Sequence, residues 1–353
     1  MIISVSDYVI KEKRLCTTST LKDVARLANV STATVSRIIN GKGEAGKETI
    51  DRVNQIVKEL NYRPNSVAKT LSVGHSNLIA LLLPNLKNPF FSELAERIEV
   101  AANKKGYQLY LCNSQDDSEK VSYYLNKMQD QHVMGAIINS LFVLPKDLEK
   151  LESSGIATIT IDRTQSVNNV SSLRVDNQYG GYLAAKHLIK NDDLKNILFL
   201  SGPKDEQSSQ DRLIGVKKAI SELNHNKINL EVAYGDFIYD SGYQVLKKFL
   251  RKKTFHIDGI LSSNDAMALG AIRALADYDI LVPEDVRVIG YDNTQAGQFS
   301  IPRLSTIEQF NDVFFDQIID ELISIKNQET KAKEYLYRPR LIQRESTKER
   351  RVI

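Results

Sequence analysis

Short apolar strands alternate with amphipathic helices over most of this 353-residue chain, and this pattern constrains the fold more than any other feature. The segments "NLIALLLP" (77–84), "NILFLSG" (196–202) and "VRVIGYDN" (286–293) are nearly continuous apolar runs that end in polar residues. Strands of this kind are buried on both faces, as in parallel sheets covered by helices on either side. So many repeated units divide naturally into two lobes, and the sequence predicts a two-lobed α/β region.

The first part of the chain has a different pattern, with three short helices. The stretches "TLKDVARLA" (20–28) and "TATVSRIIN" (32–40) each place apolar residues on one helical face. Ser31, in the three-residue turn between them, is a good N-cap. A third helix is predicted over Lys47–Leu60. Two short helices joined by a tight turn indicate a helix-turn-helix.

The second of these helices has an outward face that suits contact with DNA. Small residues allow a helix to approach base edges, and hydroxyl or guanidinium groups bind bases and phosphates. The alternative is a helical hairpin with a solvated face, but an Ala- and Thr-rich face is a poor helix-stabilising surface. Residues 1–74 hold 12 Lys or Arg against 7 Asp or Glu, a net of +5, and the remainder has a net of −2. The outward residues are Thr32, Ala33, Thr34, Ser36 and Arg37.

Between the two regions, "NSVAKTL" (65–71) follows Pro64 and has the length of one or two helical turns. Such a short helix is marginal in water without a partner, so we expect a hinge that folds on binding DNA. Leu71 has no local apolar partner and is suited to wedge into a minor groove.

Gly41–Thr49, "GKGEAGKET", resembles a phosphate-binding loop. Glu48 stands where that motif needs a hydroxyl, and a helix precedes the stretch where a strand should be. We interpret it as a loop that leads into the third helix.

Polar and aromatic residues follow the predicted strands of the α/β region. The carboxyl ends of parallel strands meet at one edge of a sheet, where ligands bind. Carboxylates, amides and arginines suit sugar hydroxyls, and aromatic faces suit the C–H face of a sugar ring. Taken singly, each residue has a plainer interpretation as a helix cap, a turn or a core residue, but together they favour a sugar pocket. After the strands come Asn88, Phe90, Phe91, Asp162, Arg163, a loop to Arg212, Phe237, Asn264, Asp265, Asp292, Asn293 and Gln309.

The sequence offers little support for an enzyme. None of the five histidines lies on these strand-end loops, and no zinc-protease, nucleophile-elbow or dinucleotide motif is present. Asp162 and Asp292 resemble an acid/base pair, but we expect Arg163 and Arg212 to keep both ionised. We expect no enzyme activity, no metal and no cofactor.

Other features suggest a cytoplasmic protein. The only cysteines, Cys16 and Cys112, have neither metal-site nor disulfide-framework spacing. No apolar run approaches the roughly 20 residues that span a bilayer, and the first residues do not match a signal peptide. We expect no membrane partner.

The segments "TLKDVARLANVSTATVSRIIN" and "LNYRPNSVAKTL" resemble the headpiece and hinge helix of the lac/gal repressor family. The resemblance covers residues 20 to about 345. It implies a homodimer on a near-palindromic operator in double-stranded DNA, and a periplasmic-binding-protein-like effector domain whose lobes close on a ligand. Gly46 departs from the family, which often has Ser there, and this puts a phosphate contact at that position in doubt.

The resemblance also implies which residues meet DNA. Thr32 and Ala33 would read bases, Leu71 would be the wedge, and Asn65 and Ala68 would line the minor groove. The remaining DNA contacts would come from Thr20, Leu21, Ser31, Thr34, Ser36, Arg37, Asn40 and Thr49.

The strand-end set resembles the ligand set of ribose-binding proteins and ribose repressors, which makes D-ribose the first choice of effector and inducer. A related sugar, a purine-type corepressor and a phosphorylated carrier protein remain alternatives, as does a transport binding protein of the same fold.

The resemblance and the pattern together give an all-α headpiece followed by a hinge helix and a two-lobed domain, with crossovers near residues 175 and 306. The predicted parts are an extension (1–19), the headpiece (20–65), the hinge (66–75), lobe 1 (76–175 and 307–335), lobe 2 (176–306 and 336–345) and a tail (346–353).

Overall fold

The computed structural model describes residues 19–39, 45–62, 70, 74–162, 170–189, 194–223, 228–251 and 256–347. The chain separates into two compact units, Met1–Ser76 and Asn77–Ile353. Nearly all of the predicted extension and most of the hinge fall outside the described residues. So do five predicted site residues: Asn40, Asn65, Ala68, Leu71 and Arg163.

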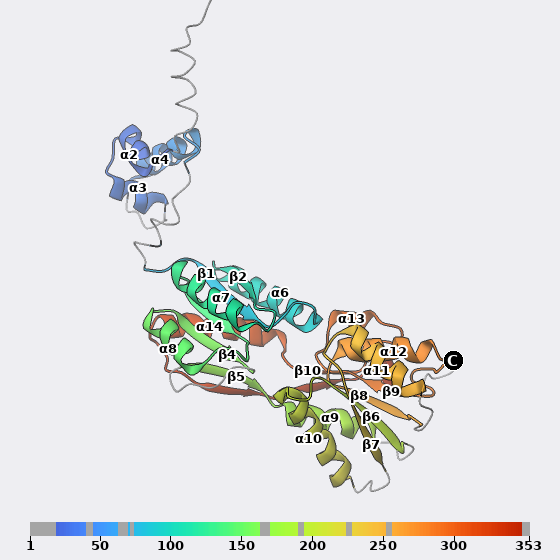
Figure 1. The fold of residues 1–353 in the computed structure, drawn as a ribbon. Helices are drawn as coiled ribbons and strands as arrows, with labels where there is room; N and C mark the ends of the chain where they lie inside the picture. The colour runs from blue at the N-terminus through green and yellow to red at the C-terminus, as the bar shows by residue number, and fades with distance from the viewer. Residues whose placement is uncertain are drawn as a thin grey trace, which may run out of the picture. The chain divides into compact units, whose positions relative to one another are not determined.

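The first unit contains the predicted helix-turn-helix, formed by α2 (Leu21–Ala28), α3 (Thr32–Ile39) and α4 (Lys47–Glu59) (Figure 1). α2 begins with a capping box, in which the Thr20 hydroxyl accepts from the backbone N–H of Asp23 and the Asp23 carboxylate accepts from that of Thr20. The core of the unit is small and consists of Val24, Ala25, Ala28, Val35 and Val53. Five buried side chains from three helices are enough to fix the helices against one another.

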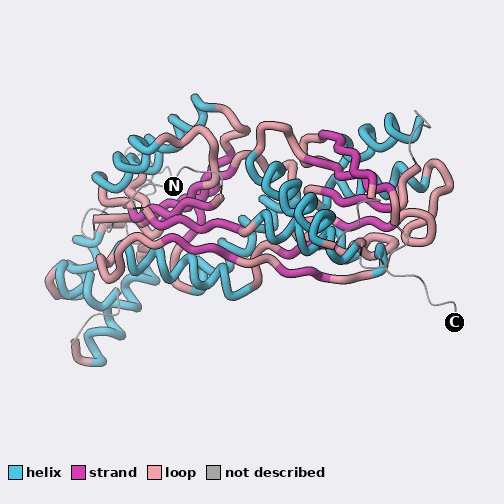
Figure 2. The backbone as a smooth tube through the Cα atoms, turned by 90° about the horizontal axis from the view of Figure 1, so that it is seen from below, coloured by secondary structure: helices cyan, strands magenta, loops and turns pink. Residues whose placement is uncertain are grey.

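The second unit contains two parallel sheets with helices on both sides of each, as predicted (Figure 2). The first sheet has the order β11-β5-β4-β3-β1-β2, and all its pairings are parallel. Its strands are β1 (Leu78–Leu83), β2 (Gln108–Asn113), β3 (Gly135–Ile138), β4 (Ala157–Ile161), β5 (Ser171–Val175) and β11 (Glu334–Tyr337). The helices around it are α6 (Pro89–Lys104), α7 (Ser118–Asp130), α8 (Pro145–Ser153) and α14 (Asp312–Lys326).

The second sheet has the order β7-β6-β8-β9 and is also parallel. Its strands are β6 (Asn196–Ser201), β7 (Asn229–Tyr234), β8 (Gly259–Ser262) and β9 (Arg287–Ile289). Its helices are α9 (Asn177–Leu188), α10 (Gln207–Glu222), α11 (Tyr239–Arg251), α12 (Asp265–Ala276) and the short α13 (Gln295–Phe299). We call the part around the first sheet lobe 1 and the part around the second sheet lobe 2.

β1 shows why these strands read as unbroken apolar runs. Ile79, Leu81 and Leu83 point into a cluster shared with α6 and α14, whereas Ala80 and Leu82 point into a cluster shared with α7 and α8. Successive side chains of a strand face opposite sides, so a sheet covered on both faces needs apolar residues at every position.

The chain passes from lobe 1 to lobe 2 between Val175 and Asn177, which agrees with the predicted crossover near residue 175. The two later crossovers lie a few residues beyond the predicted positions. β10 (Thr306–Glu308) pairs with β12 (Arg340–Ile342), and Ile307 packs in the lobe 2 core. β11 extends lobe 1 to Tyr337, past the predicted end at residue 335.

The predicted tail also begins later, because a short 3₁₀ helix, η1 (Glu345–Thr347), packs against lobe 2. The Ser346 hydroxyl donates to the carbonyl of Val288 at 2.6 Å and accepts from the backbone N–H of Ser305 at 2.8 Å. These buried bonds tie the first residues of the supposed tail to the lobe.

α9 and α10 lie side by side because two glycines permit it (Figure 1). A Cβ atom at Gly215 would lie 1.9 Å from the carbonyl oxygen of Gln178, and one at Gly181 would lie 2.0 Å from that of Arg212. Both obstacles are backbone atoms, which cannot rotate away. The close approach fixes α10, the helix that carries Arg212.

We predict that Gly215→Ala destabilises the protein by about 1–3 kcal/mol, because the added methyl group pushes the two helices apart. Urea unfolding of the purified protein measures the effect. Ser221→Ala, at an exposed position on the same helix, is the control and should change the free energy of unfolding by under about 0.5 kcal/mol. Equal stability of Gly215→Ala and the control would contradict this account of the contact.

Candidate effector pocket and DNA-binding surface

The carboxyl ends of strands from both lobes surround a cavity of about 270 Å³. Side chains follow β1, β4, β7, β8, β9 and β10 into it, and α10 adds others. Nine of the ten predicted effector residues line this cavity, and the tenth, Arg163, lies outside the described residues. The nine are Asn88, Phe90, Phe91, Asp162, Arg212, Phe237, Asn264, Asp292 and Gln309.

The aromatic lining comes from both lobes. Phe90 and Phe91 lie in the first turn of α6, and their rings meet edge to face with centroids 5.2 Å apart. Both line the cavity, and Phe91 also packs in the lobe 1 core. Phe237, from lobe 2, follows β7 and packs so closely over Gly202 that a Cβ atom there would lie 2.1 Å from its ring.

Arg212 is held rigidly at the lobe 2 side. The sequence suggested that a loop leads as far as Arg212, but α10 begins earlier, at Gln207, so Arg212 lies in the second turn of the helix. Its Nε donates to Asn177 Oδ1 at 2.8 Å, and its Nη1 donates to the carbonyl of Ser263. Its guanidinium carbon lies 3.7 Å from the centre of the Tyr291 ring. The side chain is therefore positioned before any ligand arrives.

Burial outweighs the nearby Arg212 in setting the pKa of the two carboxyl groups predicted for the pocket. Burial raises the pKa of Asp162 to about 6, although the backbone N–H of Val175 and the charge of Arg212 act in the opposite direction. Burial also raises the pKa of Asp292 well above its ordinary value, against the opposing effect of Arg212. A ligand that donates hydrogen bonds to both groups would compensate this cost of burial.

Four residues that line the cavity have positive φ angles: Asp116 (53°), Asp162 (45°), Phe237 (68°) and Asp292 (120°). Side chains disfavour these conformations, which cost of order 1–3 kcal/mol and cluster at functional sites. The cavity therefore carries local backbone strain of this order.

Asn88 and Asn264 combine a structural role with their place in the pocket. The Asn88 side chain caps α6 by accepting from the N–H of Phe90 at 3.1 Å. Asn264 caps α12 by accepting from Met267, and its amide nitrogen donates to the carbonyl of Phe237 at 2.9 Å. Asn264 thus holds the Phe237 loop in place.

Asp265 is buried beneath the pocket and does not line it. Its carboxylate accepts from the N–H of Thr294 at 2.7 Å, from the hydroxyl of Thr294 at 3.0 Å and from the hydroxyl of Thr306 at 2.6 Å. It therefore holds the loop that carries Asp292. Of the two adjacent residues predicted for the site, Asn264 lines the pocket and Asp265 supports it from below.

Sequence analysis missed several residues that line the cavity. Asn139 directly follows β3, so the same rule that found the others could have found it. Asn85, Asp116, Pro203 and Asp236 also follow strands, within three residues of the ends of β1, β2, β6 and β7, so that rule applies to them as well. Glu206 and Ser208 were missed because they were taken as part of the loop to Arg212, whereas α10 begins at Gln207. The missed residues are Asn85, Asp116, Asn139, Pro203, Glu206, Ser208 and Asp236.

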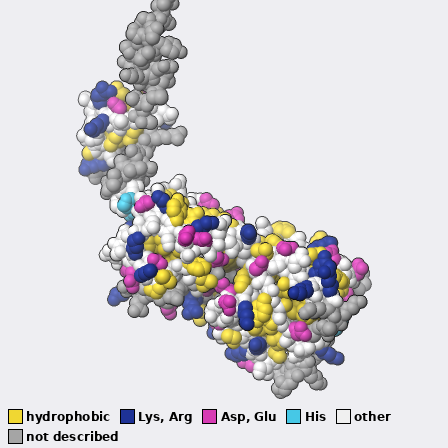
Figure 3. Space-filling model, viewed as in Figure 1, with side chains coloured by type: hydrophobic (Ala, Val, Ile, Leu, Met, Phe, Trp, Pro, Cys, Tyr) yellow, Lys and Arg dark blue, Asp and Glu magenta, His cyan; other side chains and the backbone are white. Residues whose placement is uncertain are grey.

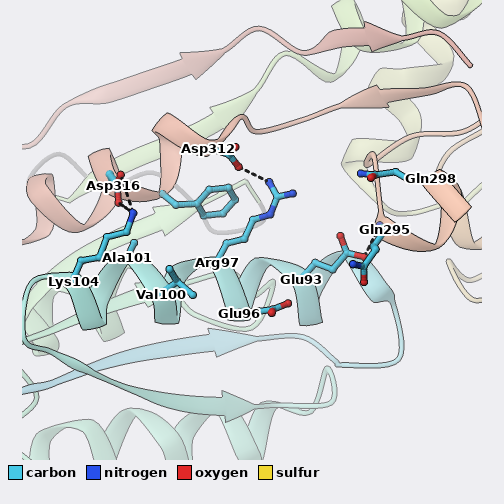
Figure 4. A pocket seen from close by; sticks show the side chains of 11 residues that line it. Glu93, Glu96, Arg97, Val100, Ala101, Lys104, Gln295, Gln298, Asp312 and Asp316 are labelled. Carbon is cyan, nitrogen blue, oxygen red and sulfur yellow. Dashed lines mark hydrogen bonds and ion pairs between the residues drawn. The ribbon is translucent and has the colours of Figure 1, made fainter.

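A second, larger hollow of about 620 Å³ lies along α6, α13 and α14 (Figure 4). Arg97 pairs with Asp312 at 3.4 Å and Lys104 with Asp316 at 3.1 Å, and Glu93 and Glu96 add two further carboxyl groups to its lining. At its end the Glu93 carboxylate accepts from the backbone N–H of Gln295 at 2.9 Å. Glu93 lies one turn after Phe90 on α6, and Gln295 begins α13. This bond therefore joins the two lobes beside the pocket.

In the first unit, Thr32, Ala33 and Arg37 are exposed on α3, and Thr34 and Ser36 are half-buried. Lys and Arg prevail among the charged side chains on the visible face of this unit (Figure 3). The outward face predicted from the sequence is thus accessible to a partner.

Three other predicted DNA contacts have structural roles. Leu21 is half-buried and packs against the core of the unit. The Thr20 hydroxyl belongs to the capping box of α2. The Ser31 hydroxyl accepts from the N–H of Thr34 at 3.0 Å, which confirms its expected role as an N-cap.

Gly46 is the N-cap of α4, and Thr49 lies half-buried in the first turn of that helix. The second half of the stretch Gly41–Thr49 thus leads into the third helix, and residues 41–44 lie outside the described residues. Nothing lies within 4 Å of a Cβ atom placed on Gly46, so the Ser of the family pattern would fit there.

Among the described residues, none of the helices has the length and apolar character to cross a bilayer. The same part of the chain shows no group of three or more His, Cys, Asp or Glu side chains placed to hold a metal ion.

Comparison with known proteins identifies both units. Residues 20–65 match the model described as bacterial regulatory proteins, lacI family, and residues 79–301 match that of a periplasmic binding protein domain. The chain is 36% identical over 291 residues to the ribose operon repressor of Halalkalibacterium halodurans, covering 82% of this chain and 85% of that protein. It is 34% identical over 312 residues to the transcriptional repressor PurR of Pectobacterium atrosepticum, covering 87% and 91%.

Comparison with solved structures points to the same family. A lac repressor dimer bound to operator and an anti-inducer is 28% identical, with a TM-score of 0.81 and coverage of 94% of this chain and 99% of that chain. A LacI family regulator from Enterococcus faecium with bound ribose is 28% identical, with a TM-score of 0.68 and coverage of 76% and 98%. The chain belongs to the lacI family of bacterial regulatory proteins and joins that family's DNA-binding domain to a periplasmic-binding-protein-like domain.

Proposed function

We propose that the protein is a cytoplasmic transcriptional repressor that holds a near-palindromic operator as a homodimer and releases it when D-ribose binds between its lobes. α3 enters the major groove, with Thr32 and Ala33 at base edges and Arg37 toward phosphate. Asn65, Ala68 and Leu71 act in the minor groove, and Asn40 and Thr49 add contacts to the DNA backbone. The observation that carries the effector assignment is the single cavity lined by nine residues of the predicted sugar set.

The chemistry of the cavity supports a small polyol. Asp162 and Asp292 are acceptors for hydroxyl groups, and the side chains of Asn88 and Gln309 add amides beside them. Phe90 and Phe237 offer aromatic faces from opposite lobes, where a ring could lie between them. A ligand held this way touches both lobes at once and so favours their closure. Arg163 is expected to add a second guanidinium to the site.

The bond between Glu93 and Gln295 offers a route from the pocket to the rest of the molecule. α6 carries Phe90 and Glu93, while α13 follows the loop of Asp292. A ligand that draws Phe90 and Asp292 together changes the relation of these two helices. An effector acts on DNA binding only through such a difference between states.

A purine-type corepressor is the second candidate, because PurR proteins are among the relatives. An aromatic pair also suits a flat base. In that case the ligand would strengthen operator binding, so the sign of the response separates the two functions.

The homodimer is proposed from apolar residues at the end of α13. Phe299 is 78% exposed and Ile301 is 86% exposed in the single chain. Two neighbouring large apolar side chains at such exposure are typical of a surface that a partner covers.

The first prediction concerns Phe237. In fluorescence anisotropy with operator DNA, D-ribose should release the wild-type protein, and Phe237→Ala should bind operator normally but respond at least about tenfold more weakly, since it loses one aromatic face. Thermal shift with ribose, other sugars and purines identifies the ligand independently.

Tyr234→Ala, which removes an exposed aromatic side chain of β7 outside the cavity, is the matched control and should respond as wild type. A normal ribose response in Phe237→Ala would show that the pocket is assigned wrongly. A purine that strengthens operator binding would favour the second candidate.

The second prediction concerns Asp162, whose pKa is raised from 3.8 to about 6. The folded state then binds the proton more tightly than the unfolded state, so burial of the charged carboxylate costs stability above pH 6 and this cost fades as the pH falls toward 4. Asp162→Asn should therefore stabilise the ligand-free protein by about 1–2 kcal/mol at pH 7.5 and by less at pH 4.5. It should also weaken sugar binding.

Urea unfolding at the two pH values measures the first effect, and calorimetry with ribose the second. Asp205→Asn removes an exposed carboxyl of a nearby loop and should show neither. A loss of stability in Asp162→Asn that is the same at both pH values would contradict the account.

The third prediction concerns the dimer. Sedimentation should give the wild-type protein about twice the mass of one chain, and the double variant Phe299→Asp/Ile301→Asp should sediment as a monomer with weakened operator binding. Ile214→Asp, an exposed position on α10, should remain dimeric. A double variant that is still dimeric would place the interface elsewhere.

A further inference from the structure

The lining of the effector pocket is rich in acidic groups. Among the described lining residues, five carry carboxyl groups and one carries a guanidinium group. Arg163 lies outside the described residues, and even counted with the pocket it would leave five carboxyl groups against two guanidinium groups. The acidic residues are Asp116, Asp162, Glu206, Asp236 and Asp292.

Glu206 has the most distinctive position of the five. It is the N-cap residue of the 16-residue helix α10, is only 7% exposed, and lines the cavity together with Ser208 of the first turn. The N-terminus of a helix usually attracts anions, because its free N–H groups and the helix dipole favour negative charge. Here the residue at the N-cap is itself acidic and buried, and its side chain makes no capping hydrogen bond to the helix.

The effect of Glu206 extends to Asp162. Burial is the main cause of the raised pKa of Asp162, and the negative charge of Glu206 raises it further. Glu206 is therefore close enough to influence a charge in the ligand-binding part of the cavity. A phosphate group, with a charge between −1 and −2 near neutral pH, would meet the same repulsion.

The positive charge of Arg212 already acts on two carboxyl groups of the lining, since it opposes the rise in the pKa of both Asp162 and Asp292. Its Nε and Nη1 donate to Asn177 and to the carbonyl of Ser263, so these two nitrogens are already engaged within the protein. The uncharged lining groups are amides and a hydroxyl, which pair equally well with the hydroxyls of a neutral sugar. The pocket thus combines good hydrogen bonding for a polyol with an unfavourable potential for an anion.

We propose that Glu206 is a specificity-determining residue that makes the pocket accept an unphosphorylated sugar and reject its phosphate ester. The inference rests on the proposed sugar-binding function and adds the class of ligand. With this specificity, the repressor responds to a sugar before a kinase phosphorylates it and does not respond to the phosphorylated sugar.

Calorimetry with D-ribose and D-ribose 5-phosphate at pH 7.5 tests this on three full-length proteins: wild type, Glu206→Gln and Glu222→Gln. Glu206→Gln keeps the size and hydrogen-bonding capacity of the side chain and removes its charge. Glu222→Gln makes the same change at the exposed far end of α10. The quantity compared is the ratio of the two dissociation constants, so a general loss of stability does not imitate the effect.

We expect wild type and Glu222→Gln to bind ribose at least about a hundredfold more tightly than the phosphate, and Glu206→Gln to lower this ratio by about tenfold or more. If wild type binds both ligands alike, or Glu206→Gln binds ribose with an unchanged ratio, the specificity role is wrong while the sugar function stands. Binding of the phosphate alone overturns the inference. Binding of neither ligand overturns the ribose assignment as well.

Discussion

Two parallel sheets bring the carboxyl ends of their strands to one cavity, and the chemistry of this protein depends on that convergence. Side chains from residue 85 to residue 309 meet there because parallel strands all deliver their following loops to the same edge. The position of Arg212 depends on it further, since the glycines that bring α9 against α10 fix the helix from which it projects. No segment of the chain forms the site alone, so anything that fills the cavity contacts both lobes.

Much of this site could be predicted from the sequence, because apolar strands end abruptly in polar or aromatic residues. Asn88, Asp162 and Asp292 each follow such a run, and the parallel topology of the two sheets brings them to the same cavity. Glu206 was not predictable, since nothing in "PKDEQSSQD" marks where α10 begins, and the start of the helix decides whether Glu206 and Ser208 face the cavity. The positive φ angles of Asp162 and Phe237, and the pairing of β10 with β12, likewise depend on contacts distant in sequence. The raised pKa values of Asp162 and Asp292 could not be predicted, because charge partners are visible in a sequence and burial is not.

The empty pocket contains groups that lower the stability of the protein, and a ligand that bonds to these groups can offset part of that cost. Buried carboxyl groups with raised pKa values and strained backbone at four residues cost stability in the empty state. The bond from Glu93 to the start of α13 links this region to the contact between the lobes. A sugar that satisfies the carboxyl groups therefore has a direct physical means of shifting the balance between two arrangements of the lobes.

The central claim is that ribose and operator DNA oppose each other through such a shift, and thermodynamic linkage tests it most directly. The dissociation constant of D-ribose should be measured by calorimetry with the free protein and with the protein saturated by operator. We predict that operator weakens ribose binding by the same factor by which ribose weakens operator binding. Equal ribose affinity in the two states would contradict the account.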